Sequence, residues 1–159
     1  MVHIRRWSRA GIIALLLLGF AACQRSDGGA LPEPSATAVG QVSPLAGTAW
    51  ELVSYGTALS QTAPLVSDKP NVFRFDQSSN LSGSAGCNSM FGIYAVTGTL
   101  LTITQFGQTA MACADNAVMN QEYYILENIP KAGTWTIVSD TLTLSDATHT
   151  FTFIRRRDQ

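Results

Sequence analysis

The sequence has 159 residues, which is the length of one domain and leaves little room for a second. Only 13% of the residues are charged, and 10 basic side chains nearly balance 11 acidic ones, giving a formal net charge of -1. Nucleic-acid-binding proteins normally carry a basic stripe or patch, so this composition argues against that class. The 46% hydrophobic fraction argues against disorder over most of the chain.

The first 22 residues are typical of an export signal. Arg5, Arg6 and Arg9 form a positively charged start, and residues 10–22 are almost wholly apolar. This apolar run is shorter than the ~20 residues that a membrane-spanning helix needs. We therefore expect residues 1–22 to be a lipoprotein signal peptide.

Cys23 is the predicted site of lipid attachment. The segment Phe20-Ala21-Ala22-Cys23 resembles a bacterial lipobox, in which the cysteine is acylated and becomes the new N-terminus. Two or three acyl chains, at ~0.8 kcal/mol per buried CH₂, anchor a protein stably in a bilayer. Gln24 resembles an outer-membrane sorting signal, so we expect an outer-membrane lipoprotein that faces the periplasm. The alternatives are a secreted chain cut after Ala22 and an uncleaved anchor.

Residues 23–44 are predicted to form a flexible tether. This stretch is rich in Gly, Pro, Ser, Ala and Thr and has no hydrophobic periodicity. The folded domain is expected over residues 45–155, with a basic tail at 156–159.

Alternating apolar and polar residues predict short strands through most of the domain. Trp50 and Leu52 flank Glu51, and the same period of two recurs around Arg74, Thr102, Thr136, Thr143 and Thr152. Two hairpin turns are predicted, one at Ser139-Asp140 and one over residues 146–149.

One segment has helical periodicity instead. Asp115 is a predicted N-cap for a helix over 116–128, which Pro130 and Gly133 end. Gln121 and Tyr124 are expected to lie off the core face. The expected apolar stripe, which includes one carboxylate, is Val118, Met119, Glu122, Tyr123, Ile125, Leu126 and Ile129. The predicted fold is a β-rich α+β structure, a small, partly open antiparallel β-barrel with one amphipathic helix.

Two cysteine-centred segments, residues 81–94 and 108–113, together resemble the META domain family, the family of heat-shock protein HslJ. The matching residues, in chain order, are Trp50, Gly83, Gly86, Cys87, Asn88, Gly92, Tyr94, Thr109, Met111, Cys113, Glu122, Leu142, Leu144 and Phe153. The resemblance implies a small barrel-like fold, no established enzymatic activity, and links to envelope stress, drug tolerance, secretion or motility.

The remaining cysteines, Cys87 and Cys113, form an even pair in a chain expected to enter an oxidising compartment. A disulfide is the simplest interpretation, and the alternatives are two buried thiols or a redox-active pair. The sequence has no Cys-X-X-Cys motif, and His149 is the only histidine after the predicted signal. We therefore expect no metal site and no catalytic cysteine.

The other candidate site residues favour structural roles. Glu122 is expected either half-buried against the sheet or bound to backbone amides near Asn88. Asn88, in a glycine-rich bend, is expected to satisfy backbone groups or to adopt a left-handed conformation, and the alternative is contact with a ligand. His149 is expected to be a solvated turn residue. No nucleophile with a base, and no carboxylate pair with an assignable geometry, points to an enzyme.

The first functional hypothesis is a non-enzymatic, lipid-anchored envelope protein acting in stress response, drug tolerance or assembly and secretion through periplasmic contacts. A second is a lipocalin-like carrier of a small apolar ligand or lipid inside the barrel. A third is an inhibitor of a cell-wall hydrolase, using an exposed loop over residues 82–92. We expect a monomer that reaches the membrane through acylated Cys23, binds an unknown protein partner or apolar ligand, and needs no cofactor.

Overall fold

The computed structural model describes residues 43–67 and 69–157. The predicted signal, Cys23 and nearly all of the predicted tether lie outside the described residues. Within them, the chain forms nine strands, one α-helix and one 3₁₀ turn. These are β1 (Thr48–Thr57), β2 (Ser60–Thr62), β3 (Val72–Phe75), β4 (Asn80–Ser84), β5 (Ser89–Thr97), β6 (Leu100–Gln108), α1 (Asn116–Asn128), η1 (Ile129–Lys131), β7 (Thr134–Val138), β8 (Thr141–Ser145) and β9 (His149–Arg156).

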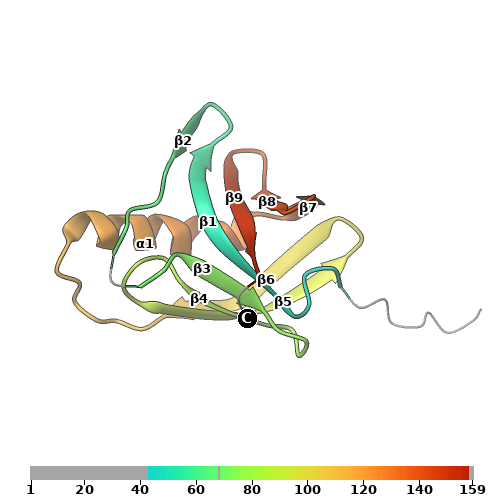
Figure 1. The fold of residues 1–159 in the computed structure, drawn as a ribbon, viewed down its shortest axis with the longest axis horizontal. Helices are drawn as coiled ribbons and strands as arrows, with labels where there is room; N and C mark the ends of the chain where they lie inside the picture. Colours follow the sequence, from blue (N-terminus) through green and yellow to red (C-terminus); the bar gives the residue numbers. More distant parts are fainter. Residues whose placement is uncertain (1–42, 68, 158–159) are drawn as a thin grey trace, which may run out of the picture. The chain divides into compact units, whose positions relative to one another are not determined.

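The strands form one antiparallel sheet that closes on itself through β1 (Figure 1). On one side of β1, Trp50 pairs with Phe73 of β3, and on the other it pairs with Arg155 of β9. The ring is weakest between β6 and β7, where Leu100 and Thr134 form the one ladder pair between the two strands. The predicted β-rich, partly open barrel with one helix is therefore confirmed.

Alternation along the strands places the large side chains inside the ring, where they form one packed cluster. Edge-to-face aromatic pairs cross the interior: Phe73 with Phe153, at 5.6 Å between ring centroids, and Phe75 with Tyr94, at 5.0 Å. The largest fully buried side chains are Trp50, Phe73, Phe75, Phe151, Phe153, Leu45, Leu52, Leu81, Met90, Ile125, Ile129 and Leu142.

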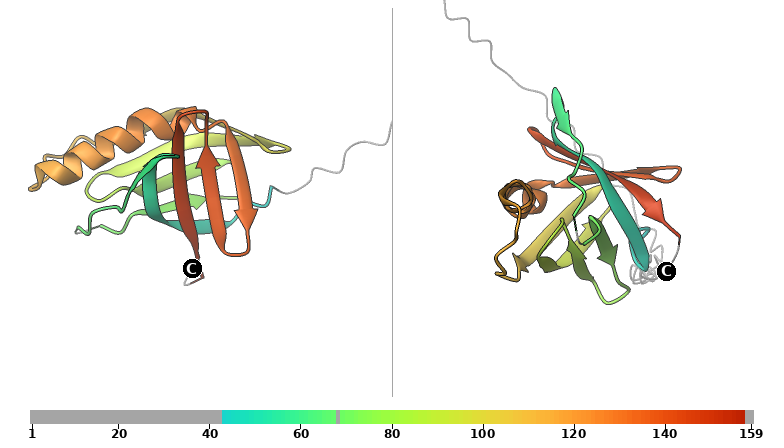
Figure 2. Two further views of the ribbon diagram at one scale, coloured as in Figure 1. Left: turned by 90° about the horizontal axis from the view of Figure 1, so that it is seen from above. Right: turned by 60° about the vertical axis from the view of Figure 1, so that its left-hand side comes forward.

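Helix α1 has the bounds expected from the sequence, and the Asp115 carboxylate caps it by accepting the Ala117 N–H at 2.7 Å. Figure 2 shows the helix end-on, beside the barrel strands, in its right-hand view. No helix in the described part of the chain is long and apolar enough to cross a bilayer.

The buried face of α1 differs from the expected apolar stripe. Gln121, expected off this face, is buried, whereas Met119 and Tyr123, expected on it, are exposed; Glu122 is buried on it as expected. Tyr124, also expected off the core, packs its ring against Tyr55 at 5.3 Å. The expected face of α1 was wrong because hydrophobicity alone does not determine which helix residues are buried here. The loops packed against this face present backbone polar groups, and polar side chains of the helix satisfy them.

Gly83 allows β3 and β4 to approach each other. A Cβ at this position would lie 2.3 Å from the Val72 carbonyl oxygen, and backbone atoms there cannot move aside as a side chain can. Gly83→Ala is expected to destabilise the domain by about 2 kcal/mol or more, measured by urea unfolding. Gly133→Ala is the matched control, because its Cβ would have no neighbour closer than 3.9 Å. Equal stability of the two variants would contradict this account.

Candidate functional site

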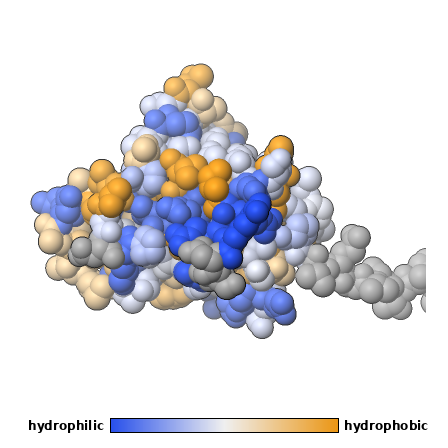
Figure 3. Space-filling model, in the orientation of Figure 1, coloured by the Kyte–Doolittle hydropathy of each residue, from blue (hydrophilic) through white to orange (hydrophobic). Residues whose placement is uncertain are grey.

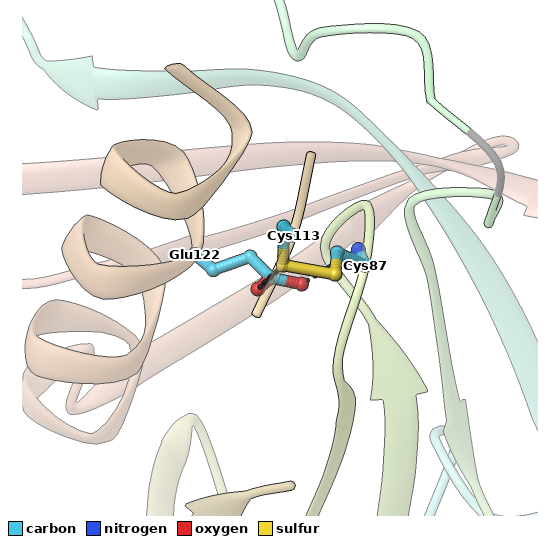
Figure 4. A group of neighbouring side chains, drawn as sticks. All are labelled: Cys87, Cys113 and Glu122. Carbon is cyan, nitrogen blue, oxygen red and sulfur yellow. Dashed lines mark hydrogen bonds between the residues drawn. A yellow bond between two sulfur atoms is a disulfide. The ribbon is translucent and has the colours of Figure 1, made fainter. Parts of the chain in front are cut away.

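Four of the residues that carry the family resemblance, Cys87, Asn88, Cys113 and Glu122, meet beside helix α1. Figure 4 shows Cys87 from the β4–β5 loop, Cys113 from the segment between β6 and α1, and Glu122 from the helix. Asn88 follows Cys87 in the same loop. Cys87 and Cys113 form a disulfide, with their Cα atoms 6.1 Å apart. Of the three states considered for this pair, the structure contains the bridge.

The Glu122 carboxylate binds the β4–β5 loop. Oε1 accepts the backbone N–H of Cys87 at 2.7 Å and that of Asn88 at 2.6 Å, and Oε2 accepts Nδ2 of Asn88 at 2.9 Å. The side chain is only 1% exposed. Of the two roles expected for Glu122, the structure contains the second, binding to amides near Asn88. A carboxylate engaged by three donors is held in place.

Asn88 links three segments with one side chain. Its Oδ1 accepts the Met111 N–H at 2.8 Å and the Thr109 hydroxyl at 2.9 Å, while Nδ2 donates to Glu122. The amide therefore fixes the segment after β6 against the β4–β5 loop. Thr109 and Met111 thus have local structural roles within this cluster, which also contains the disulfide.

Gln121, expected off the core face, is buried beside this polar cluster. Its Nε2 donates to the Ala85 carbonyl at 2.6 Å and to Oδ1 of Asn71 at 3.1 Å, and its Oε1 accepts the Leu65 N–H at 2.7 Å. The sequence spacing indicates this buried face, because residues 118, 121, 122 and 125 follow the helical repeat of a single face.

The remaining family-motif residues pack the barrel or its loops. Gly86 adopts a φ of +131°, and a Cβ there would lie 2.8 Å from Cγ1 of Val118. A Cβ at Gly92 would lie 3.0 Å from the Phe106 ring. Trp50 is fully buried, and its Nε1 donates to the Thr48 hydroxyl at 2.7 Å.

The segment from residue 82 to 92 is not the exposed loop expected from its glycines. Its two ends belong to β4 and β5, and the connecting residues Ala85, Gly86 and Asn88 are buried. The loop is held inward because Glu122 and Gln121 supply the hydrogen-bond partners that water would otherwise provide.

Two hollows share the segment Met111-Ala112 in their lining. One, of about 520 Å³, is lined by both cysteines and Val66, and the other, of about 410 Å³, is lined by Met119 and Tyr123. We call the four side chains Val66, Met111, Met119 and Tyr123 the disulfide-side apolar surface; they are 98%, 51%, 42% and 64% exposed. Leu59, between β1 and β2, is fully exposed. Figure 3 shows a hydrophobic patch at the tip of this hairpin, apart from the main body of the domain.

His149 is not the solvated turn residue expected from the sequence. Its side chain is largely buried, its Nδ1 lies 3.0 Å from Oδ2 of Asp146, and its ring packs edge-on against Tyr124. Burial raises the pKa of Asp146, but hydrogen bonds from the His149 side chain and backbone, the Thr148 N–H and the His149 charge lower it to about 2. The pair fastens the β8–β9 turn.

This arrangement predicts an acid-sensitive turn. The pKa of Asp146 is lower in the folded state than in the unfolded state. The ionised Asp146 carboxylate therefore stabilises the fold above pH 4, and this contribution is lost as the pH falls toward 2. Partial solvent access limits the effect to about 1 kcal/mol. In unfolding curves at pH 5 and pH 2.5, Asp146→Asn is expected to lose less stability on acidification than the unchanged chain. Parallel pH profiles would contradict this role.

The arginines near the end of the described chain are in ion pairs. Arg156 is the last residue of β9 and lies 3.1 Å from Glu51, and Arg157 pairs with Asp140. Arg155 stacks its guanidinium over Trp50, 4.3 Å from the ring centre. The segment expected as a basic tail therefore begins within a paired strand.

Comparison with known proteins agrees with the residue pattern. The META domain family model matches residues 43–158, which is most of the chain. No curated protein matches the chain. A solved NMR structure of a protein from Burkholderia xenovorans is 26% identical, covers 80% of this chain and 98% of its own, and superimposes with a TM-score of 0.56. A second NMR structure, also 26% identical with a TM-score of 0.56, covers 69% of this chain and 90% of its own.

A protein with lower sequence identity shares the fold. The crystal structure of a DUF4847 family protein from Bacteroides vulgatus is 12% identical and has a TM-score of 0.50, covering 73% of this chain and 97% of its own. The matched family model and the geometry of residues 83–122 agree, so this chain belongs to the META domain family.

Proposed function

We propose that this chain is a non-enzymatic, lipid-anchored envelope protein whose META domain acts by surface contact in stress response, drug tolerance, or assembly and secretion. The observation that carries the proposal is the contrast between two groups of residues at the candidate site. The polar side chains are occupied by internal hydrogen bonds, whereas the disulfide-side apolar surface is exposed.

The chemistry of the site supports contact rather than catalysis. A general acid or base needs a free oxygen or nitrogen within reach of a substrate. In Glu122, Oε1 accepts two backbone N–H groups and Oε2 accepts Nδ2 of Asn88, while Oδ1 of Asn88 accepts from Thr109 and Met111. Exposed apolar groups that gather around hollows are a common feature of interaction surfaces.

Anchoring in this proposal depends on the sequence around Cys23. Cys23→Ser is expected to abolish acylation and to move the chain from the membrane fraction to the soluble fraction of a bacterial lysate. Intact mass spectrometry of membrane-purified protein provides the measurement, because an acylated N-terminal Cys23 differs in mass from every unprocessed form. A mature chain without acyl groups would remove the anchor and the proposed location.

The contact role needs a functional test. A bacterium lacking its own copy of this gene is exposed to envelope stress and complemented with the unchanged chain or with Met119→Glu/Tyr123→Ser. Both substituted side chains are exposed, so the melting temperature should stay within a few degrees while complementation is lost. Leu59→Glu at the distant hairpin tip is the control. Full complementation by the double variant would reject this surface.

The packed interior supports contact over the carrier alternative. A lipocalin-like carrier needs a hollow barrel, and here Trp50, Phe73, Phe75, Phe151 and Phe153 fill the ring in one cluster. The inhibitor alternative relied on an exposed loop over residues 82–92, and the buried loop removes its proposed contact.

A further inference from the structure

We propose that reduction of the Cys87–Cys113 disulfide converts this corner of the domain into a Zn²⁺ site, with the two thiolates and the Glu122 carboxylate as ligands. The inference goes beyond the proposed function and does not depend on it. Zn²⁺ commonly takes three protein ligands from cysteine, histidine and carboxylate side chains and leaves a fourth position for water.

The three side chains already lie close together. One potential ligand atom from each of Cys87, Cys113 and Glu122 lies within 4.8 Å of the other two. A tetrahedral zinc with Zn–O near 2.0 Å and Zn–S near 2.3 Å separates a bound oxygen from a bound sulfur by about 3.5 Å. Oε2 of Glu122 lies 3.8 Å from Sγ of Cys113, close to that value.

The backbone can stay where it is when the bridge opens. Two thiolates on one zinc ion lie about 3.8 Å apart. The Cα atoms of Cys87 and Cys113 are 6.1 Å apart, so rotation of the two side chains can supply this sulfur separation without moving the chain.

The surroundings of Glu122 prepare its oxygen as a ligand. Oε1 is fixed by two backbone N–H groups, and Oε2 has one close donor, Nδ2 of Asn88 at 2.9 Å, which leaves a lone pair toward the sulfurs. Hydrogen bonds that orient a ligating carboxylate in this way are typical of metal sites. The 520 Å³ hollow lined by both cysteines supplies an entry path and room for a bound water.

The conversion takes two steps, reduction of the disulfide and then binding of Zn²⁺. A cellular dithiol gives two electrons and two protons to the disulfide and is itself oxidised to a disulfide, which leaves two thiols on this chain. Zn²⁺ then binds as both thiols lose their protons to solvent. The same residues therefore alternate between a covalent bridge and a metal-bridged form that ties the same two segments to α1.

The test uses the Cys23→Ser full chain, so that Cys87 and Cys113 are the remaining cysteines of the three in the sequence. It is reduced with a phosphine, which becomes a phosphine oxide, and titrated with Co²⁺ as a spectroscopic substitute for Zn²⁺. The expected result is one Co²⁺ per chain with thiolate charge-transfer bands, release of two protons, and displacement by Zn²⁺. The oxidised chain is expected to show none of these.

Matched variants test each ligand. Glu122→Gln is expected to weaken Co²⁺ binding at least about tenfold, while Glu127→Gln on the exposed face of the same helix leaves it unchanged. Glu122→Asp keeps a carboxylate and is expected to bind more tightly than Glu122→Gln, with folding of each checked by circular dichroism. Zn²⁺ is expected to raise the melting temperature of the reduced chain but not that of Cys87→Ser/Cys113→Ser.

Several results would overturn the proposal. Equal binding by oxidised and reduced chains would place the metal elsewhere, and equal binding by Glu122→Gln would remove the carboxylate from the site. One metal per two chains would make the site intermolecular. A reduced chain that stays unfolded with Zn²⁺ present would show that no preformed site survives reduction.

Discussion

Glu122→Ala is expected to lower the free energy of unfolding by about 3 to 5 kcal/mol, a large share of the stability of a domain of this size. The substitution removes the acceptor of three donors, two of them backbone N–H groups in the β4–β5 loop. Each donor left without a partner costs about 1 to 3 kcal/mol, and the emptied volume adds a packing loss. Chemical denaturation monitored by tryptophan fluorescence measures the difference.

The same helix offers a control for Glu122→Ala. Glu127 is half-exposed, and its ion pair with Lys131 spans 3.8 Å at the surface. Glu127→Ala should change the unfolding free energy by less than about 0.5 kcal/mol. The loss of unfolding free energy for Glu122→Gln should lie between those of Glu127→Ala and Glu122→Ala. The glutamine carbonyl can still accept the backbone N–H groups, but its N–H₂ group faces another donor, the Asn88 amide. A loss under about 1 kcal/mol for Glu122→Ala would refute the role given to this carboxylate.

Loss of the Cys87–Cys113 bridge is expected to cost about 3 to 4 kcal/mol. The two cysteines are 26 positions apart, and opening this loop increases the conformational entropy of the unfolded chain. Cys87→Ser, Cys113→Ser and the double variant should therefore be destabilised alike. The measurement is urea unfolding of all three beside the unchanged chain.

Reduction provides an internal check on the bridge. The unchanged chain, unfolded in a metal-free buffer with a reductant, should match the double serine variant and show no further loss. A wide difference between the single and double serine variants would mean that each thiol has a separate packing role. In that case the entropic account of the bridge would be wrong.

The fold was largely predictable from patterns of local sequence. Period-two alternation located most strands, and Asp115 with the following repeat gave the bounds of α1. The turn at Ser139-Asp140 was also expected, and Ser139 adopts a positive φ of 55° there. Each of these features depends on neighbours within a few residues, which is the information that a single sequence contains.

Features that depend on distant partners were harder to predict. The helical pattern alone does not reveal that Gln121 is buried, because its partners Leu65, Asn71 and Ala85 come from other segments of the chain. His149 was expected in solvent because Tyr124, which covers it, lies on the helix. The gathering of Cys87, Cys113 and Glu122 is likewise set by tertiary structure, since no spacing rule for metal ligands joins them.

The position of β1 between β3 and β9 has a consequence for the order in which the barrel closes during folding. Glu51 in β1 and its partner Arg156 in β9 are 105 positions apart in the chain, so β1 can form long before the strand that covers one of its edges. The meander from β3 to β6 needs only sequential neighbours and can assemble earlier. Until β9 pairs with β1, the uncovered edge of β1 can pair with another chain, so a chaperone that covers this edge would reduce aggregation until the final strand is in place.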